Sequence, residues 1–276
     1  MSPLITANQL EEIMNSGEEV LLCDCRFDLV DPLIGKKSYE ESHLPGAIYV
    51  DLDKDLSGKK NGSNGRHPLP SPEAWAQTKK CLGMSPNTLV VAYDNQDSVY
   101  ASRLWWMLKA TGHANVRVLD GGLDAWHGPM GTIPRVPTPC AQAIASMPYA
   151  GLVLVDEVVE NLSSQKCKVL DARTEDRFHG KNETLDPVGG QIPGATNRFF
   201  KNNLSATAFK TPEQLFKEFS DVLGLMKASE IIHQCGSGVT ACHNILAMEL
   251  AGFKGSRLYA GSWSEWCADP KRPIKL

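Results

Sequence analysis

The sequence contains no long uninterrupted run of apolar residues, no excess of basic residues and no Cys-x-x-Cys pair. A membrane-spanning helix needs roughly 18 or more consecutive apolar residues, so none is expected. The net charge of −4 gives no electrostatic reason to expect binding to nucleic acid. The first residues lack a basic segment followed by an apolar core, so we also expect no signal peptide.

The eight cysteines are too few, in a chain of 276 residues, to indicate a disulfide-rich domain. Their spacing does not suggest a zinc site either. We therefore expect reduced thiols and a cytoplasmic location. With 42% apolar and 22% charged residues, the composition is that of a globular protein with one large domain or two of ordinary size.

What the sequence does have is a cysteine in a glycine-rich segment, Cys235-Gly236-Ser237-Gly238-Val239-Thr240. The apolar run before it predicts a buried strand, and the apolar residues from 241 to 250 predict a helix after it. Gly236 and Gly238 would let the turn curl, because glycine accepts positive φ. Inward-pointing backbone N–H groups at a helix N-terminus would then favour a thiolate. Cys235 is therefore a candidate nucleophile, the alternative being one more small buried side chain.

Four motifs of the first half recur in the second half, in the same order and at an offset of roughly 140 to 148 residues. The pairs are Cys23–Arg26 with Leu170–Arg173, His43–Ala47 with Gln191–Ala195, Val91–Asp94 with Ile232–Cys235, and Asp120–Trp126 with Ala260–Trp266. This register indicates two copies of one domain. Short apolar strands alternating with helices predict an α/β fold, with a mostly parallel sheet covered by helices on both faces in each copy.

A proline-rich stretch without apolar periodicity separates the copies, at residues 128–148. We therefore predict an N-terminal domain at 1–130, a linker at 131–150 and a C-terminal domain at 151–276. Ligands bind at the carboxyl ends of parallel strands, which is where Cys235 lies. Asp94 holds the matching place in the first copy, so that copy is expected to be non-catalytic.

With these motifs the sequence resembles the tandem rhodanese family of sulfurtransferases over nearly its whole length. The resemblance rests on Asp171-Ala172-Arg173, Gln191-Ile192-Pro193-Gly194-Ala195, Cys235-Gly236-Ser237-Gly238-Val239-Thr240 and Gly261-Ser262-Trp263-Ser264-Glu265-Trp266. It implies two tandem rhodanese-like domains, of which the C-terminal one is catalytic. The cysteine loop is similar to that of the 3-mercaptopyruvate sulfurtransferases, whereas thiosulfate-preferring relatives usually carry a cation in the loop.

The resemblance also implies a mechanism without a metal or an organic cofactor. The Cys235 thiolate would attack the sulfur of 3-mercaptopyruvate and become a persulfide. Backbone N–H groups of Gly236, Gly238, Val239 and Thr240 would hold that persulfide. A thiol acceptor such as thioredoxin, or cyanide, would then remove the outer sulfur. Thiosulfate:cyanide sulfurtransferase is the alternative activity.

Proton handling and donor binding are assigned by the same resemblance. Ser237, His67 and Asp53 match a proposed Ser–His–Asp relay, although a loop histidine such as His67 is often merely solvated. Arg177 matches an arginine that binds the donor carboxylate. Arg103 is a further candidate from the first domain, with domain packing as its alternative role.

Two arginine positions bear on the substrate. Arg173 follows a strand, and we expect it to form a structural ion pair. The sequence departs from the mercaptopyruvate enzymes near Asp186, where those enzymes carry a second carboxylate-binding arginine. Because the cysteine loop holds no cation for a dianion, we still expect 3-mercaptopyruvate to be preferred over thiosulfate.

Two other classes of function share parts of this pattern. A cysteine-dependent phosphatase needs an arginine six residues after its cysteine, and that position here is Ala241. A non-catalytic binding module has no need of an intact cysteine loop, and formation of a persulfide would distinguish it from an enzyme.

Overall fold

The computed structural model describes residues 2–276 and divides them into two compact units. The first unit contains residues 2–58, 70–150 and 205–209. The second contains residues 59–69, 151–204 and 210–276. No helix within the described residues combines the length and the apolar character needed to cross a membrane.

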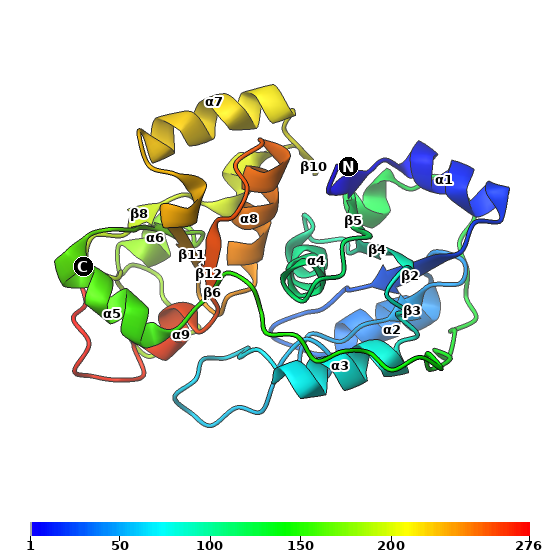
Figure 1. Ribbon diagram of the computed structural model, residues 1–276, viewed down its shortest axis with the longest axis horizontal. Helices are drawn as coiled ribbons and strands as arrows, with labels where there is room; N and C mark the ends of the chain where they lie inside the picture. The colour runs from blue at the N-terminus through cyan, green and yellow to red at the C-terminus, as the bar shows by residue number, and fades with distance from the viewer. Residues whose placement is uncertain (1) are drawn as a thin grey trace. The chain divides into compact units, whose positions relative to one another are not determined.

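The first unit is built on a five-stranded sheet in the order β1-β5-β4-β2-β3, in which all neighbouring strands are parallel (Figure 1). The strands are β1 (Leu4–Ile5), β2 (Val20–Asp24), β3 (Ile48–Tyr49), β4 (Leu89–Tyr93) and β5 (Val116–Leu119). The helices are α1 (Ala7–Ser16), α2 (Leu33–Glu41), α3 (Pro72–Cys81) and α4 (Val99–Ala110), followed by a 3-10 turn η1 (Gly122–Ala125).

The second unit has a parallel sheet of the same design, in the order β6-β12-β11-β7-β8. Its strands are β6 (Leu152–Val153), β7 (Lys168–Asp171), β8 (Thr196–Asn197), β11 (Ile231–Gln234) and β12 (Arg257–Tyr259). Its helices are α5 (Val155–Ser164), α6 (Glu175–Phe178), α7 (Pro212–Leu223), α8 (Thr240–Leu250) and α9 (Ser262–Trp266). Two 3-10 turns, η2 (Phe200–Asn203) and η3 (Ala228–Glu230), also belong to this unit. A small sheet pairs β9 (Leu204–Ser205) with β10 (Ala208–Phe209), and residues 205–209 of it belong to the first unit.

The two sheets have the same strand order, since each strand of the first has a counterpart at the same place in the second. This confirms the prediction of two tandem α/β copies. The central strands β4 and β11 are largely buried, as is usual where helices cover both sides of a parallel sheet. The helices that follow them, α4 and α8, are accordingly buried over most of their length.

Capping residues begin several of these helices. Thr6 caps α1, and its hydroxyl accepts the N–H of Gln9 while the Gln9 side chain accepts the N–H of Thr6. Thr211 and Gln214 form the same reciprocal pair at the start of α7. Such capping boxes satisfy backbone donors that the first helical turn leaves without partners.

The units differ from the predicted domain ranges in three stretches. The predicted linker, residues 131–150, is part of the first unit, where the N–H of Cys140 donates to the carbonyl of Lys80. Residues 205–209 also belong to the first unit. Residues 59–69 were predicted in the first domain but belong to the second unit, because Arg66 and its neighbours hydrogen-bond there.

Candidate active site

Cys235 follows strand β11 directly and opens the turn that leads into α8. Only 2% of its surface is exposed. The backbone N–H of Gly238 donates to Sγ of Cys235 at 3.2 Å. Gly238 has φ of +77°, and a Cβ there would lie 2.3 Å from the carbonyl oxygen of Ala260. The turn can therefore point this N–H at the sulfur only because residue 238 is glycine.

The segment after β12 hydrogen-bonds to the backbone of the cysteine loop. The N–H of Cys235 donates to Oγ of Ser262 at 3.0 Å, and the carbonyl of Cys235 accepts the N–H of Trp263 at 3.0 Å. Ser262 itself adopts φ of +54°, which is unfavourable for a residue with a side chain. These bonds keep the loop in one conformation, as a positioned nucleophile requires.

Gly236 is needed for a different reason from the predicted one, because its φ is not positive. A Cβ at Gly236 would lie 2.8 Å from Nη2 of Arg66 and 3.5 Å from Nη2 of Arg177. The missing side chain therefore lets two guanidinium groups approach the cysteine loop. The loop carries no cation of its own, but the structure brings two to it from other segments.

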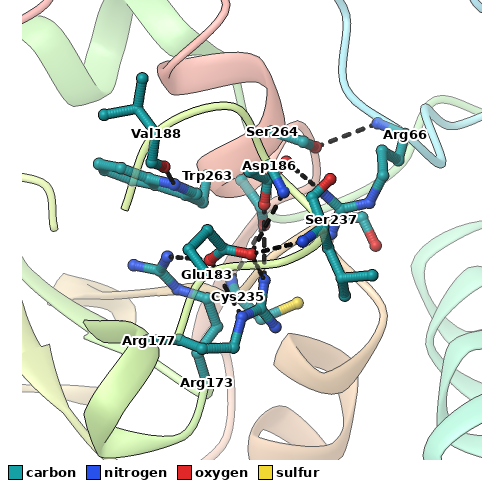
Figure 2. A network of polar contacts seen from close by, with 12 residues as sticks. Arg66, Arg173, Arg177, Glu183, Asp186, Val188, Cys235, Ser237, Trp263 and Ser264 are labelled. Atoms are coloured by element: carbon teal, nitrogen blue, oxygen red, sulfur yellow. Dashed lines mark hydrogen bonds and ion pairs between the residues drawn. The ribbon is translucent and has the colours of Figure 1, made fainter. Parts of the chain in front are cut away.

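Two carboxylates of the segment after α6 bind these arginines (Figure 2). Nε and Nη2 of Arg177 donate to the carboxylate of Glu183 at 3.0 and 2.9 Å. Nη1 of Arg66 pairs with Oδ1 of Asp186, whose Oδ2 lies 3.5 Å from Nη2 of Arg177. Burial alone would raise the pKa of Glu183, but the hydrogen bonds from Arg177 and the backbone lower it overall. Burial raises the pKa of Asp186, and Arg66 offsets part of that effect.

Arg173 forms the predicted structural ion pair. Its Nε and Nη2 donate to the carboxylate of Asp171 at distances of 2.7 to 3.1 Å, and its guanidinium stacks over Trp263 at 4.6 Å. Its Nη2 also donates to the carbonyl of Gly190 at 2.7 Å. Arg173 thus braces the segment that presents Glu183 and Asp186, while Arg177 remains beside the loop.

His67 and Ser237 lie together in the second unit. Nδ1 of His67 is 2.8 Å from Oγ of Ser237, and both residues are buried. In one tautomer the imidazole accepts the serine proton, and in the other it donates, so the pair can pass a proton in either direction. His67 is therefore not the solvated loop residue of the alternative reading.

The other predicted site residues have the following places. Val239 and Thr240 lie at the N-terminus of α8, and Val239 is its N-cap. Asp53 belongs to the first unit, where its N–H donates to the carboxylate of Asp51 at 2.9 Å. Arg103 is buried in α4 of the first unit, and its Nη2 donates to the carbonyl of Leu56 at 3.3 Å. The catalytic role of Asp53 and the substrate role of Arg103 stay predictions.

Sequence reasoning missed Arg66. A signal was present, because Asp186 stands where an arginine was expected, and Arg66 directly precedes the candidate His67. The ion pair between Arg66 and Asp186 connects these two positions. Within residues 2–276 there is no group of three or more His, Cys, Asp or Glu side chains arranged to hold a metal ion.

Comparisons with known proteins place this geometry in a family. Residues 6–129 and 154–269 each match the family described as "Rhodanese-like domain". The "Probable 3-mercaptopyruvate sulfurtransferase" of Pseudomonas aeruginosa is 42% identical, over 98% of this chain and 97% of that protein. The "Thiosulfate sulfurtransferase" of Rattus norvegicus is 34% identical, over 95% of this chain and 91% of that protein. The solved structure of 3-mercaptopyruvate sulfurtransferase from Leishmania major is 28% identical, covers 99% of this chain and 75% of its own, and has a TM-score of 0.82.

Proposed function

The chain belongs to the rhodanese family, and on that premise we propose that it is a sulfurtransferase that takes sulfur from 3-mercaptopyruvate onto Cys235. The observation that carries the proposal is the pair of guanidinium groups, from Arg66 and Arg177, beside Gly236 in the cysteine loop. A carboxylate held by charge-assisted hydrogen bonds to these guanidinium groups would lie next to the loop that carries Cys235.

In the first half-reaction the Cys235 thiolate attacks the sulfur of the donor, and a sulfur–sulfur bond forms. The carbon–sulfur bond of the donor breaks and leaves its electron pair on carbon as the enolate of pyruvate. The proton of the donor thiol ends on that carbon, which gives pyruvate and the Cys235 persulfide. Ser237 and His67 are placed to carry this proton, because their hydrogen bond joins a hydroxyl to an imidazole.

In the second half-reaction a thiol acceptor, such as thioredoxin or a small thiol, attacks the outer sulfur of the persulfide. The N–H of Gly238, which donates to Sγ in the resting loop, supports the negative charge that returns to Cys235. Cyanide serves as the acceptor in an assay. The thiol acceptor and the predicted cytoplasmic location remain proposals supported by the family's chemistry and by the cysteine usage of the sequence.

Thiosulfate is the second candidate donor, and the same two arginines favour it. Thiosulfate is a dianion that needs cations near the attacked sulfur, and Arg66 and Arg177 supply positive charge that the loop itself lacks. We retain 3-mercaptopyruvate as the first choice because Glu183 and Asp186 already balance the charge of the two arginines.

A side-by-side steady-state assay with 3-mercaptopyruvate and thiosulfate, each with cyanide as the acceptor, tests the donor. We expect a higher kcat/KM for 3-mercaptopyruvate, and a kcat/KM for thiosulfate that equals or exceeds it would refute the choice. Intact mass after donor treatment should rise by about 32 Da, one sulfur atom. Cys235→Ser should abolish that rise, and an adduct that persists in this variant would refute the assignment of the nucleophile.

A further inference from the structure

Asp186 stands where two guanidinium groups meet, and none of the assigned catalytic steps uses it. Its side chain is 3% exposed, and Oδ1 pairs with Nη1 of Arg66. Within residues 2–276 no hydrogen-bond donor reaches the buried Oδ2, which lies 3.5 Å from Nη2 of Arg177. A buried carboxylate oxygen without a donor is costly, so this arrangement calls for an explanation.

The arginines that hold Asp186 are the ones that reach the cysteine loop. Arg66 uses Nη1 for Asp186 and turns Nη2 towards Gly236. Arg177 directs Nε and Nη2 to Glu183, and its Nη1 and Nη2 lie 3.8 and 3.5 Å from the Cβ position of Gly236. An anion bound to the guanidinium group of Arg66 or Arg177 would therefore be separated from Asp186 by that group alone.

The charges of the two arginines and of the carboxylates that pair with them sum to zero before a donor binds. Arg66 and Arg177 contribute two positive charges, and Glu183 and Asp186 contribute two negative charges. The neighbouring pair of Arg173 and Asp171 adds no net charge. A donor is thus attracted by nearby hydrogen-bond donors, but repelled by the buried negative charge of Asp186 in proportion to its own charge.

We propose that Asp186 is a specificity-determining residue that discriminates against dianionic sulfur donors in favour of donors with a single negative charge. The proposal deepens the proposed function, on which it rests, by naming what sets the choice between the two donors. Removing the charge of Asp186 should help any anion, but it should help thiosulfate about twice as much, on a free-energy scale, as the single carboxylate of 3-mercaptopyruvate.

Asp186→Asn tests the proposal, because it keeps the shape of the side chain and an oxygen that can accept from Arg66. We expect the ratio of kcat/KM for thiosulfate to kcat/KM for 3-mercaptopyruvate to rise about tenfold. Raised ionic strength should reduce this gain, because screening weakens the repulsion in the wild-type protein. Glu175→Gln is the matched control, since it removes the same charge from an exposed position on helix α6, and its ratio should stay at the wild-type value.

A fall in kcat/KM for both donors at an unchanged ratio would mean that Asp186 only holds Arg66 in place, and would overturn the proposal. If Asp186→Asn turns over too slowly to measure, thermal stabilisation by sulfate, compared with acetate at equal ionic strength, replaces the kinetic ratio. Sulfate must then stabilise the variant more, relative to acetate, than it stabilises the wild type, and an equal effect overturns the proposal. A wild-type preference for thiosulfate would refute the proposed donor, but the change in ratio would still decide the role of Asp186.

Discussion

The loops after β4 and β11 occupy the same place in the two units, and in each the following helix begins five residues after the key side chain, Asp94 or Cys235. In the first unit the carboxylate of Asp94 accepts four backbone N–H groups at 2.8 to 2.9 Å, from Gln96, Ser98, Tyr100 and Ala101. In the second unit the corresponding position holds the sulfur of Cys235, which accepts the N–H of Gly238. We call this place in each unit, where backbone N–H groups at the start of a helix face one acceptor side chain, its cradle.

The difference explains why only the second unit is proposed to carry the chemistry. The Asp94 carboxylate fills its own cradle permanently, whereas a cysteine sulfur can accept a second sulfur and release it. The supporting parts are shared, because Arg26 pairs with Asp24 as Arg173 pairs with Asp171, each with a shortest contact of 2.7 Å. The scaffold is therefore common to both units, and the proposed chemistry would depend on the residue in the cradle and on the arginines beside it.

Replacing Cys235 with aspartate, the residue of the first unit's cradle, should have the largest effect on sulfur transfer. Cys235→Asp is expected to abolish sulfur transfer completely, because a carboxylate cannot form a persulfide. The loops match in length, so the variant should remain folded, as judged by circular dichroism. A gain of about 32 Da on donor treatment of this variant would show that another cysteine carries the sulfur.

Removing the Asp94 carboxylate should lower the stability of the first unit without changing sulfur transfer at Cys235. Asp94→Ala leaves four N–H groups without their acceptor, and we expect the free energy of unfolding of the first unit to fall by about 3 kcal/mol or more. Urea unfolding measures the change. Folded Asp94→Ala protein should still form the Cys235 persulfide in full, and a loss of persulfide with an unchanged unfolding midpoint would mean that the comparison of the two cradles is wrong.

The units also differ in the arginines beside the cradle, Arg66 and Arg177, which belong to the second unit. At the offset that relates Asp171 to Asp24, the counterpart of Arg177 is Val30, which is 91% exposed. Arg177→Ala and Arg66→Ala should each lower kcat/KM for 3-mercaptopyruvate by about 10- to 100-fold, the value of a charge-assisted contact of roughly 1.5–3 kcal/mol. Lys201→Ala, a change at an exposed cation of the same unit, serves as the control. Wild-type kinetics for either arginine variant would remove that arginine from the donor site.

A pH dependence of donor choice is the smallest expected effect. Burial raises the pKa of Asp186, so its carboxyl takes up a proton at a higher pH than an ordinary aspartate as the solution becomes acidic. Protonation leaves Arg66 and Arg177 opposed by Glu183 alone, whose pKa is lowered. The thiosulfate to mercaptopyruvate ratio of kcat/KM should therefore rise in the wild type as the pH is lowered from neutrality, before ordinary aspartates take up protons, but stay flat in Asp186→Asn. A parallel rise in the variant would assign the effect to another group.

Local features of the sequence could be predicted because their partners lie close along the chain. The structural ion pair of Arg173 and the strand–cysteine–helix order each depend on neighbours within a few residues. The repeat was visible because four motifs kept their order, and the matching strand orders of the two sheets confirm it. The reason for Gly236 was predicted wrongly, because its constraint comes from Arg66, which is remote in sequence.

The sequence by itself determined the two-copy α/β fold and the family, and it pointed to Cys235 as the candidate nucleophile, since each follows from short motifs that local geometry explains. Only the tertiary structure decided that residues 59–69 join the second unit, where Arg66 reaches Asp186 across 120 positions of sequence and His67 reaches Ser237 across 170. The physical reason is that periodicity and propensity encode contacts between neighbours in the chain. Ion pairs between distant segments depend on the tertiary fold, and local sequence patterns do not encode them.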